Sequence, residues 1–127
     1  MASALPDGEP MPEDGSLPVS VAIGAENRTL SAYVHIPFCS HRCGYCDFNT
    51  YIAGELRGVT HSSYADSLVA EIRRSSVVLT RAGVPSRPLT SVFFGGGTPT
   101  LLPASALVRV LETLRSQHGL HSDAEIT

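Results

Sequence analysis

The three cysteines of this chain, Cys39, Cys43 and Cys46, lie within a stretch of eight residues. Thiolates bind soft metal ions and iron–sulfur clusters, and thiols gathered this closely rarely serve packing alone. The spacing C-x3-C-x2-C also matches one face of a helix, so structural packing is an alternative. Pro37 before the cysteines and Gly44 between them disfavour a helix. The pattern therefore favours a metal centre in a loop.

Two kinds of metal centre fit these thiols. A structural zinc ion needs four ligands, and His35 or His41 could supply the fourth, but the usual second C-x2-C pair is absent. An iron–sulfur cluster is held by thiolates in a short loop, and three cysteines leave one iron of a [4Fe-4S] cluster without a protein ligand. A molecule with an amine and a carboxylate, such as the methionyl end of S-adenosylmethionine, could chelate that iron.

A second unusual stretch, "FFGGGTPT", covers residues 93–100. Glycine and proline punctuate strand ends, so a bare turn is one interpretation. The dinucleotide-binding pattern fails, because Thr100 stands where its last glycine belongs. The functional interpretation is that Gly95, Gly96 and Gly97 let the backbone approach a ligand closely, beside the Thr98 hydroxyl.

The elements that must position these two loops alternate along the chain. Short β-branched and aromatic runs predict buried strands, and apolar residues at helical spacing predict helices between them. Ser63 and Asp66 form a capping-box pattern at the first helix, and Pro103 and Gly119 bound the second. The predicted strands cover 29–36, 89–94 and 124–127, and the predicted helices cover 62–79 and 103–119.

This order predicts an α/β fold with a parallel sheet and right-handed crossover helices. The cysteine loop and the glycine loop each follow the carboxyl end of a strand. Ligands bind at that edge in such sheets, so we expect the two loops to lie side by side and to line one site.

Composition excludes several functions. The chain has a net charge of -3, with nine arginines and no lysine, so it offers neither a basic nucleic-acid surface nor a P-loop lysine. No apolar run is long enough to span a bilayer, and no secretory signal begins the sequence. Residues 1–27 are rich in proline, glycine and acidic residues, which predicts a disordered tail before a domain at 28–127. Three clustered cysteines suit a reducing, cytoplasmic location.

The strings "YVHIPFCSHRCGYCDFNTY" and "FFGGGTPTLL" resemble the radical S-adenosylmethionine superfamily. Within it they are similar to the group that holds the oxygen-independent coproporphyrinogen III oxidases (HemN) and the HemW haem chaperones. The resemblance covers about residues 30–127 and implies the first part of a partial (β/α)6 TIM-like barrel. A longer continuation is then expected. Because open parallel edges and apolar faces would be exposed, we expect these residues alone to be marginally stable or to aggregate.

The resemblance also implies roles for particular residues. Cys39, Cys43 and Cys46 would ligate a [4Fe-4S] cluster, whose electron cleaves the sulfonium of S-adenosylmethionine to a 5′-deoxyadenosyl radical. S-Adenosylmethionine would be contacted by two groups of residues, the aromatic Tyr33 and Tyr45 and, at the methionyl amino end, Gly96, Gly97 and Thr98. No catalytic side chain is assigned.

Two features distinguish the chain within this group. The oxidases have a further cysteine two residues after the last cluster cysteine, where this chain has Phe48. The ribose-binding glutamate of the family would follow Thr127, and Glu125 does not match it. The resemblance thus favours a HemW-type protein that binds and transfers haem, with an electron donor protein and a haem acceptor as partners.

Other functions remain alternatives. The chain would be a coproporphyrinogen dehydrogenase-like oxidoreductase of porphyrin biosynthesis if it were an active oxidase, and whether it is an enzyme at all stays open. A zinc-binding structural module and an inactive remnant are alternatives of another class. Arg42 would either balance the charge of the cluster or be exposed, and His35 would either form a hydrogen bond near the cluster or only pack.

Overall fold

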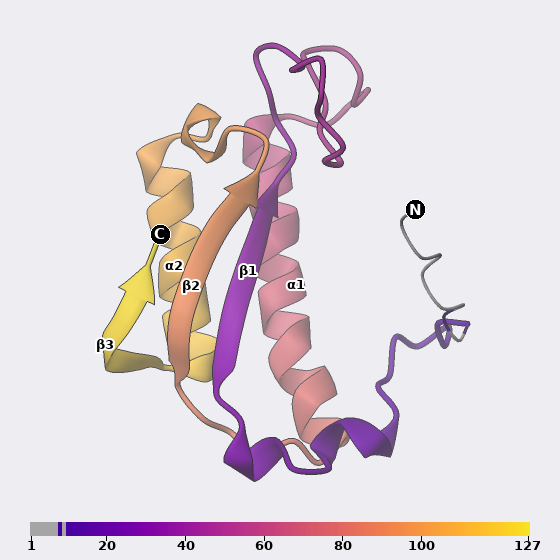
Figure 1. The fold of residues 1–127 in the computed structure, drawn as a ribbon, viewed down its shortest axis with the longest axis vertical. Helices are drawn as coiled ribbons and strands as arrows, with labels where there is room; N and C mark the ends of the chain where they lie inside the picture. The colour runs from indigo at the N-terminus through magenta and orange to yellow at the C-terminus, as the bar shows by residue number, and fades with distance from the viewer. Residues whose placement is uncertain (1–7, 9) are drawn as a thin grey trace.

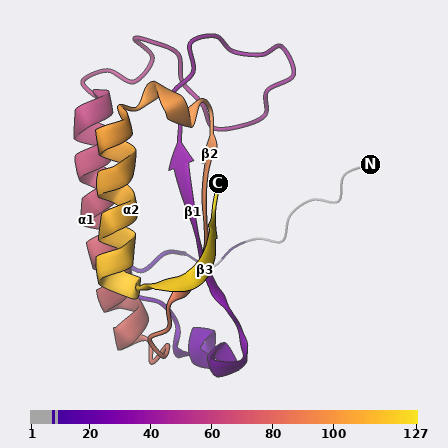
Figure 2. The ribbon, with the colours of Figure 1, turned by 90° about the vertical axis from the view of Figure 1, so that its left-hand side faces the viewer.

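The computed structural model describes residue 8 and residues 10–127. A three-stranded parallel sheet in the order β1-β2-β3 forms one layer, and two helices lie side by side on one of its faces (Figures 1 and 2). The predicted α/β alternation is confirmed. The strands are β1 (Leu30–Ile36), β2 (Leu89–Gly96) and β3 (Leu120–Ile126), and the helices are α1 (His61–Arg81) and α2 (Ala104–His118).

The core lies between the sheet and the helices. Successive strand residues point to opposite faces, so every second residue of β1 faces α1 and α2. In β2 a register shift between Leu89 and Ser91 brings both Leu89 and Val92 to that face. The apolar stripes predicted for both helices meet these residues. The core includes Val34, Ile36, Leu89 and Val92 from the strands, and Ala65, Ile72, Val110 and Leu114 from the helices.

The opposite face of the sheet is open in the described chain, and this corrects the prediction that the strands are buried. Tyr33 is 59% exposed and Phe93 is 49% exposed. The two helices pack on the other side, so nothing in the described residues covers this face (Figure 2). A short aromatic and β-branched run cannot by itself distinguish a strand buried on both faces from one buried on a single face.

The first helix begins earlier than predicted. Thr60 has an extended backbone, its side chain accepts a hydrogen bond from Ser63 N at 3.0 Å, and Ser63 Oγ accepts one from Thr60 N at 2.9 Å. The capping box therefore joins Thr60 and Ser63, not Ser63 and Asp66. Asp66 lies inside the helix and pairs with Arg109 of α2 at 2.6 Å. A capping box usually has a Glu or Gln as its second residue, and here that residue is Ser63. The sequence pattern therefore placed the cap one turn too far along the chain.

The segment before β1 forms two short 3-10 turns, Val19–Ala22 and Ala25–Asn27. Arg28 fastens this segment by donating to Val21 O and Ile23 O, both at 3.1 Å. Residues 1–7 and 9 of the predicted tail lie outside the described residues, and disorder over 1–27 stays a prediction. Within the described part of the chain, neither helix has the length and apolar character needed to cross a membrane.

Candidate functional site

The cysteine loop, residues 39–50, leaves the carboxyl end of β1 and is closed at its base by Tyr51. Cys39 N donates to Tyr51 O at 2.9 Å, and Tyr51 N donates to Pro37 O at 2.7 Å, which forms a parallel bridge between Phe38 and Tyr51. Both ends of the loop are therefore held together at the sheet edge. The loop rises from that edge at the top of Figure 1.

The glycine loop, residues 95–98, lies directly against the base of the cysteine loop. Gly97 N donates to Ile36 O at 2.8 Å, and Thr98 N donates to Phe38 O at 2.7 Å. A Cβ atom on Gly97 would lie 2.4 Å from Phe38 O and 2.8 Å from Cys39 Sγ. The expected proximity of the two loops is confirmed, and no side chain fits at Gly97.

The other two glycines are required by similar close contacts. Gly96 has φ +107°, and a Cβ there would lie 2.8 Å from both His35 Cε1 and Ile36 O. A Cβ on Gly95 would lie 2.6 Å from the ring of Phe93 and 2.9 Å from that of Tyr33. Gly96 and Gly97 thus meet backbone atoms at the end of β1 and just after it, whereas Gly95 meets two aromatic side chains.

An aromatic pair lies on the open face of the sheet below the loops. Tyr33 and Phe93 are direct neighbours in the strand register, and their rings stack at 5.9 Å with planes 13° apart. Tyr45, the other aromatic residue predicted to contact S-adenosylmethionine, is 90% exposed on the cysteine loop. Phe93 is a further candidate for contact with S-adenosylmethionine, and the sequence analysis did not identify it. The strand register, which pairs Phe93 with Tyr33, is the observation that reveals it.

His35 connects this aromatic pair to the cysteine loop. Its Nε2 lies 2.7 Å from Asn49 O, a carbonyl that only accepts, so Nε2 carries the proton. In the neutral ring Nδ1 then accepts from the Tyr33 hydroxyl at 3.0 Å. His35 thus forms hydrogen bonds and does not only pack, while a role beside a bound cluster stays a prediction.

The backbone at the end of β1 is held by a second tyrosine. Tyr64 of α1 donates its hydroxyl proton to His35 O at 2.6 Å. Burial, and then the nearby Glu71 and Tyr33, raise the pKa of Tyr64 above its usual value. The phenol therefore stays a donor at neutral pH. A cavity of about 370 Å³ lies beside it, between β1 and α1, and not at the edge that carries the two loops.

The three thiols are free and differ in exposure. Cys39 and Cys46 are half-buried and Cys43 is exposed, with a turn between the last two closed by Cys46 N donating to Cys43 O at 3.1 Å. Among the described residues, no three His, Cys, Asp or Glu side chains converge on a point where one metal ion would sit. Three thiols in one loop are compatible with a [4Fe-4S] cluster, in which each thiolate binds a different iron.

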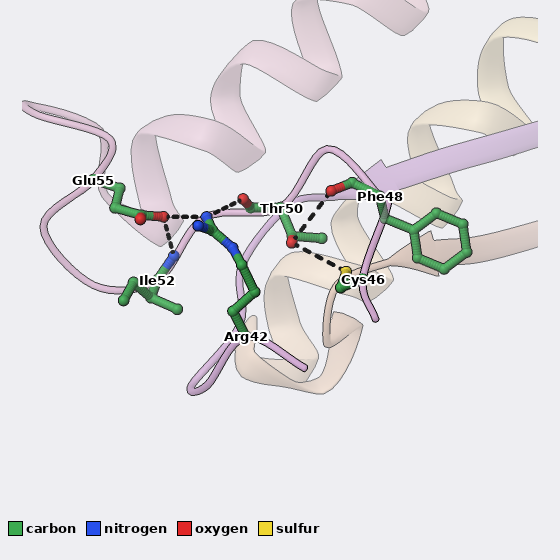
Figure 3. A network of polar contacts seen from close by, with 6 residues as sticks. All are labelled: Arg42, Cys46, Phe48, Thr50, Ile52 and Glu55. Carbon is green, nitrogen blue, oxygen red and sulfur yellow. Dashed lines mark hydrogen bonds and ion pairs between the residues drawn. The ribbon is translucent and has the colours of Figure 1, made fainter. Parts of the chain in front are cut away.

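Polar contacts fasten the middle of the cysteine loop (Figure 3). Arg42 donates to Thr50 O at 3.0 Å and pairs with Glu55 at 2.7 Å. The Glu55 carboxylate also accepts from Ile52 N at 2.9 Å. Arg42 thus ties the stretch between the first two cysteines to the segment after the third. The sequence offers no spacing or motif that singles out Thr50 or Glu55.

The chain resembles known proteins over most of its length. A family model described as the radical SAM superfamily matches residues 33–126. The haem chaperone HemW of Mycobacterium tuberculosis is 40% identical over 98 residues, which cover 77% of this chain and 24% of that protein. Radical S-adenosyl methionine domain-containing protein 1, mitochondrial, of Bos taurus is 40% identical over 115 residues, 91% of this chain and 24% of the relative.

A solved structure is also similar. The coproporphyrinogen III oxidase HemN from Escherichia coli, described as a radical SAM enzyme, superimposes with a TM-score of 0.64 and 33% identity over 78% of this chain and 21% of its own. This chain spans about a quarter of the length of the curated relatives it matches, 24% in both cases above. The family match includes all three cysteines and the whole glycine loop. The chain therefore belongs to the radical SAM superfamily.

Proposed function

We propose that this chain provides the [4Fe-4S]- and S-adenosylmethionine-binding part of a HemW-type haem chaperone. The observation that carries the proposal is the contact between the two loops. Gly97 leaves no room for a side chain beside Cys39 Sγ, so backbone groups of the glycine loop border the first thiol. Superfamily membership implies the cluster and S-adenosylmethionine, and the proposal assigns them to these residues.

The thiolates of Cys39, Cys43 and Cys46 would hold the cluster, which when bound supplies an electron for reductive cleavage of S-adenosylmethionine. Gly96, Gly97 and Thr98 would receive the methionyl end, since their backbone groups lie next to the first thiol. The exposed rings of Tyr33 and Tyr45 would offer aromatic surface for the adenine. His35 would keep Tyr33 in place through its hydrogen bonds to the Tyr33 hydroxyl and Asn49 O.

Haem binding and transfer is the finer part of the proposal. It is supported by the similarity to the haem chaperone HemW and by Phe48, which is 70% exposed where the oxidases have a further cysteine. The partners would be haem or a porphyrin, an electron donor protein and a haem acceptor, in the cytoplasm. The likeness to HemN favours coproporphyrinogen III oxidation as a second candidate.

Anaerobic reconstitution with iron and sulfide tests the cluster. We expect a brown protein with about four irons per chain. Cys43→Ser should lose most of this iron, because it removes one thiolate. Ser40→Ala is the matched control, since Ser40 is exposed in the same loop and its hydroxyl has no hydrogen bond among the described contacts. A colourless wild-type protein that retains one zinc ion would contradict the proposal.

Haem transfer and porphyrinogen oxidation are separated by two assays on the protein at its natural length. Titration with haem should give a saturable Soret band, and the bound haem should pass to apomyoglobin. Incubation with coproporphyrinogen III, S-adenosylmethionine and a reductant should yield no protoporphyrinogen. Formation of protoporphyrinogen at catalytic turnover would replace the chaperone proposal with the oxidase.

A further inference from the structure

Thr50 places a buried hydroxyl beside a predicted cluster thiol. The residue is 5% exposed, and its Oγ1 lies 3.7 Å from Cys46 Sγ and 3.5 Å from Phe48 O. Buried hydroxyls usually have a close partner. Thr113, the other buried polar residue of the described chain, has one, because its hydroxyl donates to Arg109 O at 2.8 Å. Thr50 has only the long carbonyl contact and the sulfur, whose larger radius makes 3.7 Å an ordinary contact.

We infer that Thr50 donates a hydrogen bond to the Cys46 sulfur when that sulfur is a cluster ligand, and that this bond raises the reduction potential of the cluster. The inference rests on the proposed cluster. A ligating thiol is deprotonated, so its sulfur only accepts, and the hydroxyl donates to it by turning its proton away from the more weakly held Phe48 O. One-electron reduction adds negative charge that spreads to the sulfurs. The donor therefore stabilises the reduced form more than the oxidised form.

Backbone hydrogen bonds of Thr50 and Tyr51, and not the contact with the sulfur, fix the position of the Thr50 side chain. Thr50 O accepts from Arg42 at 3.0 Å, and the next residue, Tyr51, is hydrogen-bonded through both its N and O atoms to Pro37 and Cys39, just after β1. Glu55 holds the Arg42 guanidinium from the other side at 2.7 Å. Figure 3 shows Arg42, Thr50 and Cys46 in one connected set of polar contacts. Arg42 acts here as a positioning residue, because it fixes Thr50 without reaching the sulfur in these contacts.

Burial gives this bond its weight. Water has little access to Thr50, so it cannot replace a lost donor, and a hydrogen bond is electrostatically stronger in a medium of low dielectric constant. Hydrogen bonds to the sulfurs are among the factors that set the potential of an iron–sulfur cluster. Thr50 is therefore a tuning residue of the electron-accepting step, distinct from the three ligands.

The test compares Thr50→Val, which replaces the hydroxyl with a methyl group of similar size, with Thr50→Ser, which keeps the hydroxyl. Ser40→Ala removes an exposed hydroxyl from the same loop as a control. Each protein is reconstituted, assayed for iron, and titrated with dithionite while the reduced cluster is followed by electron paramagnetic resonance. Iron content in the wild type tests the proposed function, and the potential tests Thr50.

We expect Thr50→Val to bind as much iron as the wild type but to show an about tenfold lower ratio of reduced to oxidised cluster at a fixed potential. For one electron this corresponds to a shift of about 59 mV to more negative values. Thr50→Ser and Ser40→Ala should stay within about twofold of the wild-type ratio. A wild-type potential in Thr50→Val would overturn the inference while leaving the cluster proposal intact.

A second variant decides the case in which Thr50→Val does not retain iron. Thr50→Ala also lacks the hydroxyl but is smaller. Loss of iron in Thr50→Val and Thr50→Ala, with full iron in Thr50→Ser, would support the hydrogen bond to Cys46. The hydroxyl is the feature that the wild type and Thr50→Ser share and the other two variants lack. Loss of iron in Thr50→Ser as well would overturn it, since the methyl group and not the donor would then be what the site requires.

Discussion

The glycine loop and the cysteine loop share one edge of the sheet but are held in different ways. The glycine loop is fixed by close packing, since an added Cβ at each of its three glycines would meet an atom of β1, Phe93 or the cysteine loop at 2.9 Å or less. The cysteine loop is held at its base by backbone bonds and in its middle by the exposed Arg42 and Glu55. One loop is therefore a rigid platform, and the other is a tethered segment that a cofactor can complete.

The largest expected effect is the loss of the packed contact. Gly97→Ala places a Cβ 2.4 Å from Phe38 O, a backbone atom that cannot move away cheaply. We expect a loss of about 1–3 kcal/mol in the free energy of unfolding and loss of most cluster iron. Gly44→Ala is the matched control, because a Cβ there meets nothing within 4 Å. Urea unfolding and iron analysis measure both effects, and equal behaviour of the two variants would show that the platform is not rigid.

A smaller effect is expected from the tether. Arg42→Ala removes a half-exposed ion pair and a hydrogen bond to Thr50 O, and exposed pairs contribute about 0–1 kcal/mol. We expect nearly unchanged global stability but faster amide hydrogen exchange over residues 40–50, with residues 95–98 unaffected. Arg57→Ala serves as control, because Arg57 is exposed and forms no ion pair among the described residues. Equal acceleration in both loops would remove the distinction between platform and tether.

The smallest effect concerns the helices, which provide a reference distant from both loops. His118 of α2 donates from Nε2 to Ser75 Oγ at 2.9 Å, because Ser75 already donates to Ile72 O at 2.7 Å. Burial lowers the pKa of His118 below its usual value, so the unfolded chain takes up a proton at higher pH than the folded chain. Stability is therefore full above about pH 6.5 and falls as the pH drops through the lowered pKa.

Urea unfolding of the metal-free chain between about pH 5 and pH 8 tests this sign. His118→Gln keeps a donor for Ser75 without titrating, so its stability should change less with pH in that range. His121→Gln is the control, since His121 is half-exposed and pairs with the neighbouring Asp123. An identical pH dependence in wild type and His118→Gln would show that the imidazole does not couple folding to protonation.

The fold and the position of the site follow from sequence patterns that have a direct physical cause. Pro37 follows β1 and Gly97 follows β2, two glycines later than the sequence predicted, and topology alone then brings both loops to one edge. Gly119 ends α2 as predicted, with a positive φ of +82° that favours glycine. These signals are local and need no knowledge of tertiary contacts.

Other features depend on tertiary contacts and left no local signal. The exposure of Phe93 depends on which face the helices cover, and the roles of Thr50 and Glu55 depend on how the chain returns to the sheet edge after Cys46. The Thr60 cap was missed because its partner is a serine and not an acidic residue. Marginal stability of the isolated chain stays a prediction. Its physical reason is the open aromatic face and the unpaired outer edges of β1 and β3 in the described chain, and thermal unfolding tests it.

The bridge between Phe38 and Tyr51 has a consequence for how strongly the chain can retain a cluster. Bringing the ends of a flexible segment together reduces chain entropy, and here backbone hydrogen bonds alone hold the two ends together. Binding of a cluster would then restrict only the residues of the cysteine loop that the bridge encloses. The rest of the segment between β1 and α1 would not lose further entropy. A change at Tyr51 that breaks the bridge would therefore weaken iron retention, although Tyr51 is not one of the three predicted ligands.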